Sequence, residues 1–404
     1  MAIVNKRCEQ KASNRMHDGV LPCSGPCSRM LRCILAVFLI LLLIIPQAGC
    51  GSNGENYQGI AKTGFYLDTV CTITIYGVDP DSNLGKELSE ADEEGQQKRI
   101  FQLITDAFLE CDRCEKILSK TLDSSEISKI NAAGGQTVTV SDMTAEVIEK
   151  GLAYGTLSNG VFDITIGKVT DLWNFHDFQT EDTSDSEAGT GEVTDPLPDP
   201  ELLKEAVHHV DYRKVSVDED QVTLQDPEME IDLGGIAKGY IADHLTRWLE
   251  ERGVVSAVID LGGNIVAIGG KSAGLLELPK QDFTIGIKDP QSESGQLLGI
   301  FECSDKTVVT SGTYERYVVK DGKKYHHILN PETGWPAETD VDSVTIITEK
   351  NHAVDGDGLS TTCLALGVEK GTALMETIEG AEAVFVDLDG NITSTSGAPA
   401  LTTR

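Results

Sequence analysis

The stretch EIDLGGIAKGYIADHLTRW, from Glu230 to Trp248, joins a glycine pair to an amphipathic pattern. Its apolar residues recur at steps of three and four, which is the spacing of one face of an α-helix. These residues are Ile236, Tyr240, Ile241, Leu245, Trp248 and Leu249. The pattern predicts a helix that begins at the glycine pair and packs one face on a core.

The start of this helix has the composition of an anion-binding site. Gly234 and Gly235 have no Cβ, so a ligand can approach the backbone where the first helical N–H groups lack partners. Lys238 adds a positive charge, and Asp232 offers a carboxylate to a cation, a sugar or a base edge. We predict a diphosphate site with a metal nearby. The same residues also suit a plain Gly-Gly turn before a core helix.

Length and charge limit the possible functions. The 404 residues suffice for two domains or for one large domain with insertions. The formal net charge of −32 argues against nucleic acid as a partner, because phosphates would be repelled. Aromatic residues make up only 5% of the chain, so any stacking surface must be local.

The N-terminus is typical of an exported lipoprotein. Arg29 and Arg32 precede an apolar run from Ile34 to Ile45, and Ala-Gly-Cys50 follows, which is the pattern that a lipoprotein signal peptidase cleaves. We predict a signal peptide over residues 1–49, lipidation of Cys50 and a flexible tether over residues 50–62. The mature protein would be extracytoplasmic and lipid-anchored to the cell membrane. The alternative is a short uncleaved anchor on the same side of the membrane.

The ten cysteines do not form a disulfide framework. Four lie within the predicted signal peptide, and Cys50 is the predicted lipidation site. Cys111 and Cys114 form a lone CxxC, but they lie within a helical apolar pattern from Ile100 to Leu118. We therefore expect buried thiols rather than a metal or redox pair.

The rest of the chain mixes helical and strand patterns and indicates a domain over residues 63–392, with a tail over 393–404. Residues 180–200 are acidic and almost free of apolar side chains, so we expect a disordered insertion there. We expect a surface loop over residues 79–94. Expected strands and hairpins cover 65–76, 138–140, 215–224, 254–268, 283–288, 297–301, 307–310, 314–320 and 344–348. Expected helices cover 96–118, 141–157 and 359–366, with a short helix opening at 124–128.

A second group of candidate site residues lies near the C-terminus. If Asp357 begins a helix, Thr361 lies one turn further on the same face, so a carboxylate and a hydroxyl converge as Mg²⁺ ligands. Asp357 as a simple helix N-cap is the alternative. His326 and His327 have no partner at zinc-ligand spacing, so a proton-transfer or ligand-contact role competes with a structural one.

Five ordered motifs resemble the ApbE-type FAD:protein FMN transferases, a family of flavin transferase lipoproteins, over about Thr63 to Gly390. The motifs are Val161-Phe-Asp163, Asp232-Leu-Gly-Gly-Ile-Ala-Lys238-Gly-Tyr-Ile-Ala-Asp243, Ser311-Gly-Thr-Tyr-Glu-Arg316, His326-His-Ile-Leu-Asn-Pro-Glu-Thr-Gly-Trp-Pro336 and Asp357-Gly-Leu-Ser-Thr361. The resemblance implies an α+β fold with antiparallel-rich sheets and packed helices, a T-fold-like core and a smaller accessory lobe.

The resemblance also implies a reaction and its residues. FMN would pass from FAD to a threonine or serine hydroxyl in a motif of an exported acceptor protein, with release of AMP. Mg²⁺ would be held by Asp357, Thr361 and the carbonyl of Gly235, and either Asp357 or His327 would act as base. The implied FAD contacts are Leu67, Val161, Phe162, Asp163, Asp232, Lys238 and Ser343.

Two departures from the family pattern concern FAD binding. Leu67-Asp68-Thr69 stands where the family usually has Met-Gly-Thr, and Lys120-Thr121 stands where an aromatic often stacks. We expect stacking from another aromatic, with Tyr66 as the candidate. Alternative functions are an FAD-binding lipoprotein or an FAD pyrophosphatase that releases FMN and AMP without transfer. Self-modification at Thr395-Ser396-Gly397 is a third interpretation.

Overall fold

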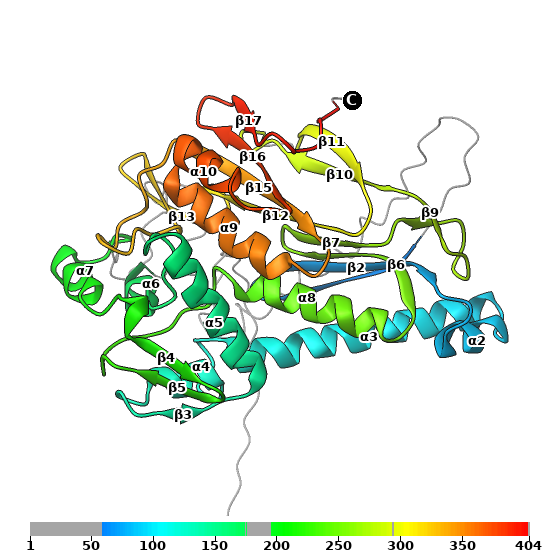
Figure 1. Ribbon diagram of the computed structural model, residues 1–404, viewed down its shortest axis with the longest axis horizontal. Helices are drawn as coiled ribbons and strands as arrows, with labels where there is room; N and C mark the ends of the chain where they lie inside the picture. Colours follow the sequence, from blue (N-terminus) through cyan, green and yellow to red (C-terminus); the bar gives the residue numbers. More distant parts are fainter. Residues whose placement is uncertain (1–58, 174, 176–194, 293–294, 403–404) are drawn as a thin grey trace, which may run out of the picture. The chain divides into compact units, whose positions relative to one another are not determined.

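The computed structural model describes residues 59–173, 175, 195–292 and 295–402 (Figure 1). An eight-stranded sheet lies at the centre, and each strand is antiparallel to its neighbours. In spatial order the strands are β1 (Ile60–Tyr66), β2 (Thr69–Val78), β6 (Val254–Leu261), β7 (Asn264–Ile268), β12 (Lys306–Gly312), β15 (Val341–Glu349), β16 (Ala381–Asp387) and β17 (Ile392–Ser394). Helices pack on this sheet, so the α+β class is confirmed.

Two tight turns join neighbouring strands of the sheet. Gly262 and Gly263 form the predicted turn between β6 and β7, with φ of 66° and 96°. Leu67 and Asp68 form the turn between β1 and β2, and both have positive φ, 54° and 55°. The prediction of one strand over residues 65–76 was therefore wrong. Non-glycine residues rarely adopt this backbone conformation, so Leu-Asp carries no clear turn signal.

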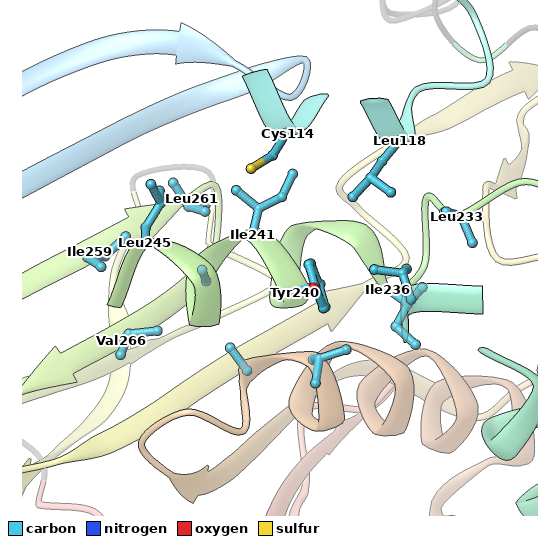
Figure 2. Close-up of a cluster of buried hydrophobic side chains, with 14 of the residues drawn as sticks. Cys114, Leu118, Leu233, Ile236, Tyr240, Ile241, Leu245, Ile259, Leu261 and Val266 are labelled. Atoms are coloured by element: carbon cyan, nitrogen blue, oxygen red, sulfur yellow. The ribbon is translucent and has the colours of Figure 1, made fainter. Parts of the chain in front are cut away.

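One face of the sheet is covered by α3 (Glu93–Leu118), α8 (Ala237–Glu250) and α9 (Ala353–Leu366) (Figure 1). In Figure 2, Ile241 of α8 points toward Cys114 and Leu118 of α3. The apolar stripe predicted for α8 is buried at Ile236, Tyr240, Ile241, Leu245 and Leu249, whereas Trp248 is only partly buried. Burial of each large side chain contributes about 1.5–3 kcal/mol to stability.

The opposite face is covered over its middle strands by a two-stranded sheet of β10 (Phe283–Lys288) and β11 (Leu297–Cys303). Thr402 pairs with Ile300 of β11, and the amide of Thr395 donates to Ala383 of β16. Residues 393–402, predicted as a tail, thus pack on the domain. Thr395 is 5% exposed, whereas Ser396 is exposed and its hydroxyl donates to Glu376 at 2.8 Å, so the self-modification interpretation stays a prediction.

A smaller lobe lies to one side of the helical layer (lower left in Figure 1). Its sheet has the strand order β3-β5-β4. The helix α7, a short 3₁₀ helix and the β13–β14 hairpin belong to the same region. The elements are α4 (Glu126–Asn131), β3 (Val138–Thr139), α5 (Asp142–Leu157), α6 (Gly167–Trp173), α7 (Pro200–Val207), η2 (Tyr212–Lys214), β4 (Val215–Asp218), β5 (Gln221–Leu224), β13 (Tyr317–Lys320) and β14 (Lys323–His326). A small core that includes Trp173, Leu203 and Leu329 joins α6, α7 and the segment after β14.

Several boundaries differ from the prediction. The expected loop over residues 79–94 contains α2 (Asn83–Ser89), and α3 begins at Glu93 because the Asp92 carboxylate caps it by accepting from Gly95 N–H at 2.9 Å. β1 begins inside the predicted tether. α7 begins inside the predicted insertion, whose residues 180–194 lie outside the described part of the chain. The remaining elements are β8 (Lys271–Ser272), β9 (Pro279–Gln281) and α10 (Val368–Met375).

The N-terminal predictions are not addressed by the structure. Residues 1–49 and Cys50 lie outside the described residues. Among the residues that are described, no helix combines the length and apolar character needed to cross a bilayer.

Close contact between α8 and α9 depends on one glycine. A Cβ placed on Gly239 would lie 2.2 Å from the carbonyl oxygen of Ala353 and 2.8 Å from the Cβ of Asp357. The Gly239 N–H donates to Asp357 Oδ2 at 2.9 Å across 118 residues of sequence. The two helices can therefore touch backbone to backbone only where no side chain separates them.

We predict that Gly239→Ala lowers the free energy of unfolding by about 2 kcal/mol or more, because backbone atoms must move apart to admit the methyl group. Chemical denaturation measures the change. Gly134→Ala is the comparison variant, because it also replaces a glycine by alanine but places the new Cβ in open space. Gly134 has a positive φ, so a strain cost is expected there without any effect on the α8–α9 contact. Equal losses in the two variants would contradict the steric argument.

Candidate active site

A cleft of about 1030 Å³ lies where the β1–β2 turn, the end of α3, the start of α8 and the middle of α9 meet. Segments 311–316 and 327–331 complete its walls. The predicted site residues that line it are Leu67, Val161, Phe162, Asp163, Asp232, Gly235, Lys238, His327, Asp357 and Thr361. Two motifs that are far apart in the sequence therefore face one cavity.

Asp232, directly before the glycine pair, is held in one orientation. Its carboxylate accepts hydrogen bonds from the Gly234 N–H at 2.8 Å and from the Thr170 hydroxyl at 2.7 Å. The Lys120 ammonium lies 3.6 Å from the same carboxylate. A ligand in the cleft would therefore meet a carboxylate that is already positioned.

The start of α8 offers fewer free donors than the sequence indicated. The N–H of Ala237 donates to the carbonyl of Leu233 at 2.8 Å, and that of Gly239 is used by Asp357. The helix has no side-chain cap, and Lys238 in its first turn lines the cleft. Because part of the helix start is already paired, the Lys238 ammonium must supply much of the attraction for an anion.

Asp357 lies inside α9 rather than at its start. The helix begins at Ala353, and the buried carboxylate of Asp243 accepts from the N–H groups of Ala353 and Val354 at 2.8 and 3.0 Å. The expectation that Asp357 begins a helix was wrong, and so was its N-cap alternative. The face relation still holds, because Thr361 lies one turn after Asp357 and both line the cleft.

Three oxygen donors near this point suit a magnesium-class ion. They are the Asp357 carboxylate, the Thr361 hydroxyl and the Gly235 carbonyl. Gly235 lies close to Thr361, since a Cβ on Gly235 would be 3.7 Å from Thr361 Cγ2 and 3.1 Å from the Phe162 ring. Mg²⁺ prefers hard oxygen ligands and leaves positions for water or phosphate oxygens. The chemistry of this donor set fits that ion.

His327 is held as a neutral imidazole. Its Nδ1 lies 3.1 Å from the backbone carbonyl of Arg316, and its own amide donates to the same carbonyl at 3.0 Å. A carbonyl can only accept, so Nδ1 carries the proton and Nε2 keeps its lone pair. Burial, with the positive charges of Arg316 and Lys238 nearby, lowers the pKa of His327 to about 3. At neutral pH the ring is therefore unprotonated at Nε2.

The neighbouring histidine has a structural environment. His326 lies in β14, is 9% exposed, and its Nε2 is 3.2 Å from the carbonyl oxygen of Ala337. Burial lowers its pKa as well. Only His327 of this pair lines the cleft.

The Val161–Asp163 turn shapes the floor of the cleft. The Asp163 carboxylate accepts from the N–H and hydroxyl of Thr165 at 2.8 and 2.6 Å and from the N–H of Tyr212 at 2.9 Å. Burial nevertheless raises its pKa. Asp163 therefore braces the turn, while the Phe162 ring lies beneath Gly235.

Two residues predicted to contact the ligand do not line the cleft. Ser343 is buried in β15 opposite Gly312 of β12 and is not among the residues that line the cleft, although Thr310 and Ser311 of β12 are. Tyr66 stacks on Phe108 of α3, with ring centroids 4.9 Å apart, so it is turned away from the cavity. The aromatic side chains that do line it are Phe65, Phe162, Phe175 and Tyr314.

Sequence reasoning missed several charged residues of the cleft. In the sequence, Lys120 stands out only because it lies where the family often has an aromatic. In the structure its ammonium contacts Asp171 and the carbonyl of Gly167, both at 2.7 Å. Glu315 and Arg316 were quoted within a motif without a role. The signal available in the sequence for these two residues was a pair of adjacent opposite charges in a glycine-containing segment. Their place in the cleft depends on packing that the sequence does not display.

Comparisons with known proteins agree with this geometry. The model of the ApbE family matches residues 67–385. An FAD:protein FMN transferase of Treponema pallidum is 31% identical over 368 residues, which cover 89% of this chain and 92% of that protein. A protein of the same name from Klebsiella pneumoniae is 36% identical over 305 residues, covering 74% and 84% of the two chains.

Solved structures are similar in fold. The ApbE protein of Thermotoga maritima has a TM-score of 0.66 and 29% identity, with coverage of 84% of this chain and 97% of that one. The flavin transferase ApbE of Vibrio cholerae also has a TM-score of 0.66, at 23% identity and with the same coverage. The match over most of the chain, together with the Treponema relative, shows that this chain belongs to the ApbE family.

Proposed function

We propose that the chain is a Mg²⁺-dependent FAD:protein FMN transferase. It would cleave FAD at the diphosphate, attach FMN to a threonine or serine hydroxyl of an exported acceptor protein, and release AMP. Family membership and the names of the relatives support flavin transfer. The observation that carries the proposal is the hydrogen bond from Gly239 of α8 to Asp357 of α9, which brings a cationic helix start and an oxygen donor set to one cavity.

The cleft supplies groups for binding a diphosphate. Lys238 and the start of α8 attract its charge, and Asp232 is oriented to accept a hydrogen bond from a sugar or base. Asp357, Thr361 and the Gly235 carbonyl would hold Mg²⁺, which when bound neutralises charge on phosphate oxygens. Groups that are held by the fold, as Asp232 and His327 are by their hydrogen bonds, need little reorganisation at the moment of reaction.

His327 is the base that the geometry favours. Its Nδ1 is tied to the Arg316 carbonyl, which leaves Nε2 free to take the proton from the acceptor hydroxyl. Asp357 instead accepts from the Gly239 amide and faces the proposed metal ligands. As the acceptor oxygen bonds to the FMN phosphorus, the bond from that phosphorus to the AMP phosphate oxygen breaks and AMP leaves. His327, protonated by this step, then returns the proton to solvent and becomes neutral again.

We also propose that the enzyme works outside the cytoplasm, held at the cell membrane by a lipid on Cys50. The Ala-Gly-Cys sequence after an apolar run supports this placement. Mass spectrometry of the N-terminal peptide tests it, because a lipid-modified Cys50 supports the anchor and an unmodified N-terminus beginning before Ile34 contradicts it.

Asp357→Ala should reduce transfer by about 100-fold or more, because it removes the only carboxylate of the proposed metal site. The full chain is incubated with FAD, Mg²⁺ and an exported acceptor candidate, and both acceptor mass and AMP are measured. Asp389→Ala, in an exposed turn, is the matched control. An FMN-sized mass gain supports transfer. Release of AMP with an unchanged acceptor would indicate the pyrophosphatase alternative, and full transfer by Asp357→Ala would remove this residue from the mechanism.

Lys238→Met should weaken FAD binding about tenfold. The substitution replaces a partly buried cation that would contact the diphosphate with a neutral side chain of similar length. Fluorescence titration with FAD measures the Kd. Lys129→Met changes the same charge on the exposed surface of α4 and should leave the Kd unaltered. Equal effects of the two variants would show that the net charge, rather than the position of Lys238, decides affinity.

The rate should not fall as pH drops through 6.5, the ordinary pKa of histidine. Because the pKa of His327 is lowered to about 3, its neutral form is available from about pH 5 to 8. The kcat/KM profile measures this, and His327→Gln should lower it by about 100-fold at every pH in that range. An acidic limb with its midpoint near 6.5 in the native enzyme would show that His327 titrates normally.

A further inference from the structure

A second group of metal-binding side chains lies outside the cleft, between α3 and α8. Glu110, Cys114 and His244 present one carboxylate oxygen, one sulfur and one imidazole nitrogen, and these three atoms all lie within 4.8 Å of one another. The group is separate from the predicted magnesium site, and of the CxxC it contains Cys114 but not Cys111. Of the residues that line the cleft, none is a cysteine.

Helix geometry brings the three donors together. Glu110 and Cys114 are four residues apart on α3, so they project from the same face on successive turns. His244 comes from α8, which packs against that face, and its Nε2 lies 2.6 Å from Glu110 Oε1. Two rigid elements hold the donors, and modest side-chain rotation separates them to the spacing of metal ligands.

The Glu110 carboxylate is oriented by an ion pair with Arg113. Arg113 donates to both of its oxygens, at 2.9 and 2.6 Å, which fixes the plane of the group. The Arg113 hydrogen bonds, with a further contribution from His244, lower the pKa of Glu110 to about 2.

Access and polarity fit an ion that enters from solvent. The side chains of Glu110 and His244 are 18% and 24% exposed, whereas Cys114 is fully buried behind them. A metal could reach the nitrogen and oxygen donors first and then the sulfur. Water at the open side would supply a fourth ligand.

We propose that Glu110, Cys114 and His244 form a site for a zinc-class divalent ion that joins α3 to α8. Mixed sulfur, nitrogen and oxygen donors in a set of three suit Zn²⁺ or Co²⁺ and do not suit Mg²⁺ or Ca²⁺, which prefer oxygen alone. On binding, the Cys114 thiol loses its proton to solvent and a metal–sulfur bond forms. The proton on His244 Nε2 moves through solvent to Nδ1, so the ring stays neutral, and the hydrogen bond from His244 to Glu110 is replaced by two metal–ligand bonds.

The position of the site gives it a structural role. Cys114 is one turn from Leu118, which lines the cleft at the end of α3, and His244 is on the same helix as Lys238. A bound ion would fix the spacing of these two helices, and with it one wall of the cleft. Metal content and thermal stability can be measured without the proposed transfer reaction. They therefore test this site independently of the proposed function.

Cobalt titration tests the site directly. The full chain is freed of metal with a chelator, placed in excess Mg²⁺ to occupy oxygen sites, and titrated with Co²⁺ alone. We expect one Co²⁺ per chain with a near-ultraviolet thiolate-to-cobalt band, release of about one proton per ion, and displacement by Zn²⁺. Zn²⁺ should also raise the Tm of the native chain.

Three variants decide the outcome. Cys114→Ser should abolish the thiolate band, and His244→Gln should weaken Co²⁺ binding by about 10-fold or more. Cys303→Ser removes a buried thiol of β11 and should leave the thiolate band and the Co²⁺ affinity unchanged. Circular dichroism checks that each variant is folded. Absence of a thiolate band up to millimolar Co²⁺ in the native chain, or its survival in Cys114→Ser, would overturn the proposal.

Discussion

The contact between α8 and α9 at Gly239 is the constraint on which the site depends. At this point the backbone of α8 lies against the Ala353 carbonyl and Asp357, with no side chain between the helices. The same contact directs the Gly239 amide to Asp357. Lys238 therefore reaches the cavity that Asp357 and Thr361 also line. Close packing of helices through small residues has here a chemical consequence as well as a structural one.

The second constraint is electrostatic. The whole chain carries a formal charge of −32, and the lining of the cleft also holds more acidic side chains than the four basic ones, Lys120, Lys238, Lys288 and Arg316. Salt screens exposed charges beyond about 10 Å, so an anionic ligand in the cleft responds mainly to the charges that line it. The acidic residues there are restrained by specific contacts, as Asp232 and Asp163 illustrate. The local field is thus set by position rather than by composition.

The smaller elements around the cleft serve to position single groups. The β13–β14 hairpin pairs Tyr317 with His326, which brings the flanking residues Arg316 and His327 together. Their main-chain and side-chain hydrogen bonds fix the tautomer of His327. Similarly, the Glu115 carboxylate accepts from the Leu67 N–H and supports a turn of two residues with positive φ. Such turns cost roughly 1–2 kcal/mol per residue and persist where their surroundings hold them.

Local pattern was sufficient for most elements and for many of the site residues. The stripe from Ile236, the hairpin at Gly262-Gly263 and the motifs at Asp232 and Asp357 follow from spacing and residue type, because helices and tight turns are set by near neighbours. The choice of His327 over His326 came from the family resemblance. Local pattern failed at Leu67-Asp68, where a distant glutamate supports the turn, and at Ser343 and Tyr66, which do not line the cleft. It could not show that Lys120 braces Asp232. The sequence alone determined the elements, the family resemblance and the chemical types of the site residues. Tertiary structure decided which of them share a cavity, because contacts across 118 residues arise from the packing of α8 on α9 and leave no periodic trace in the chain.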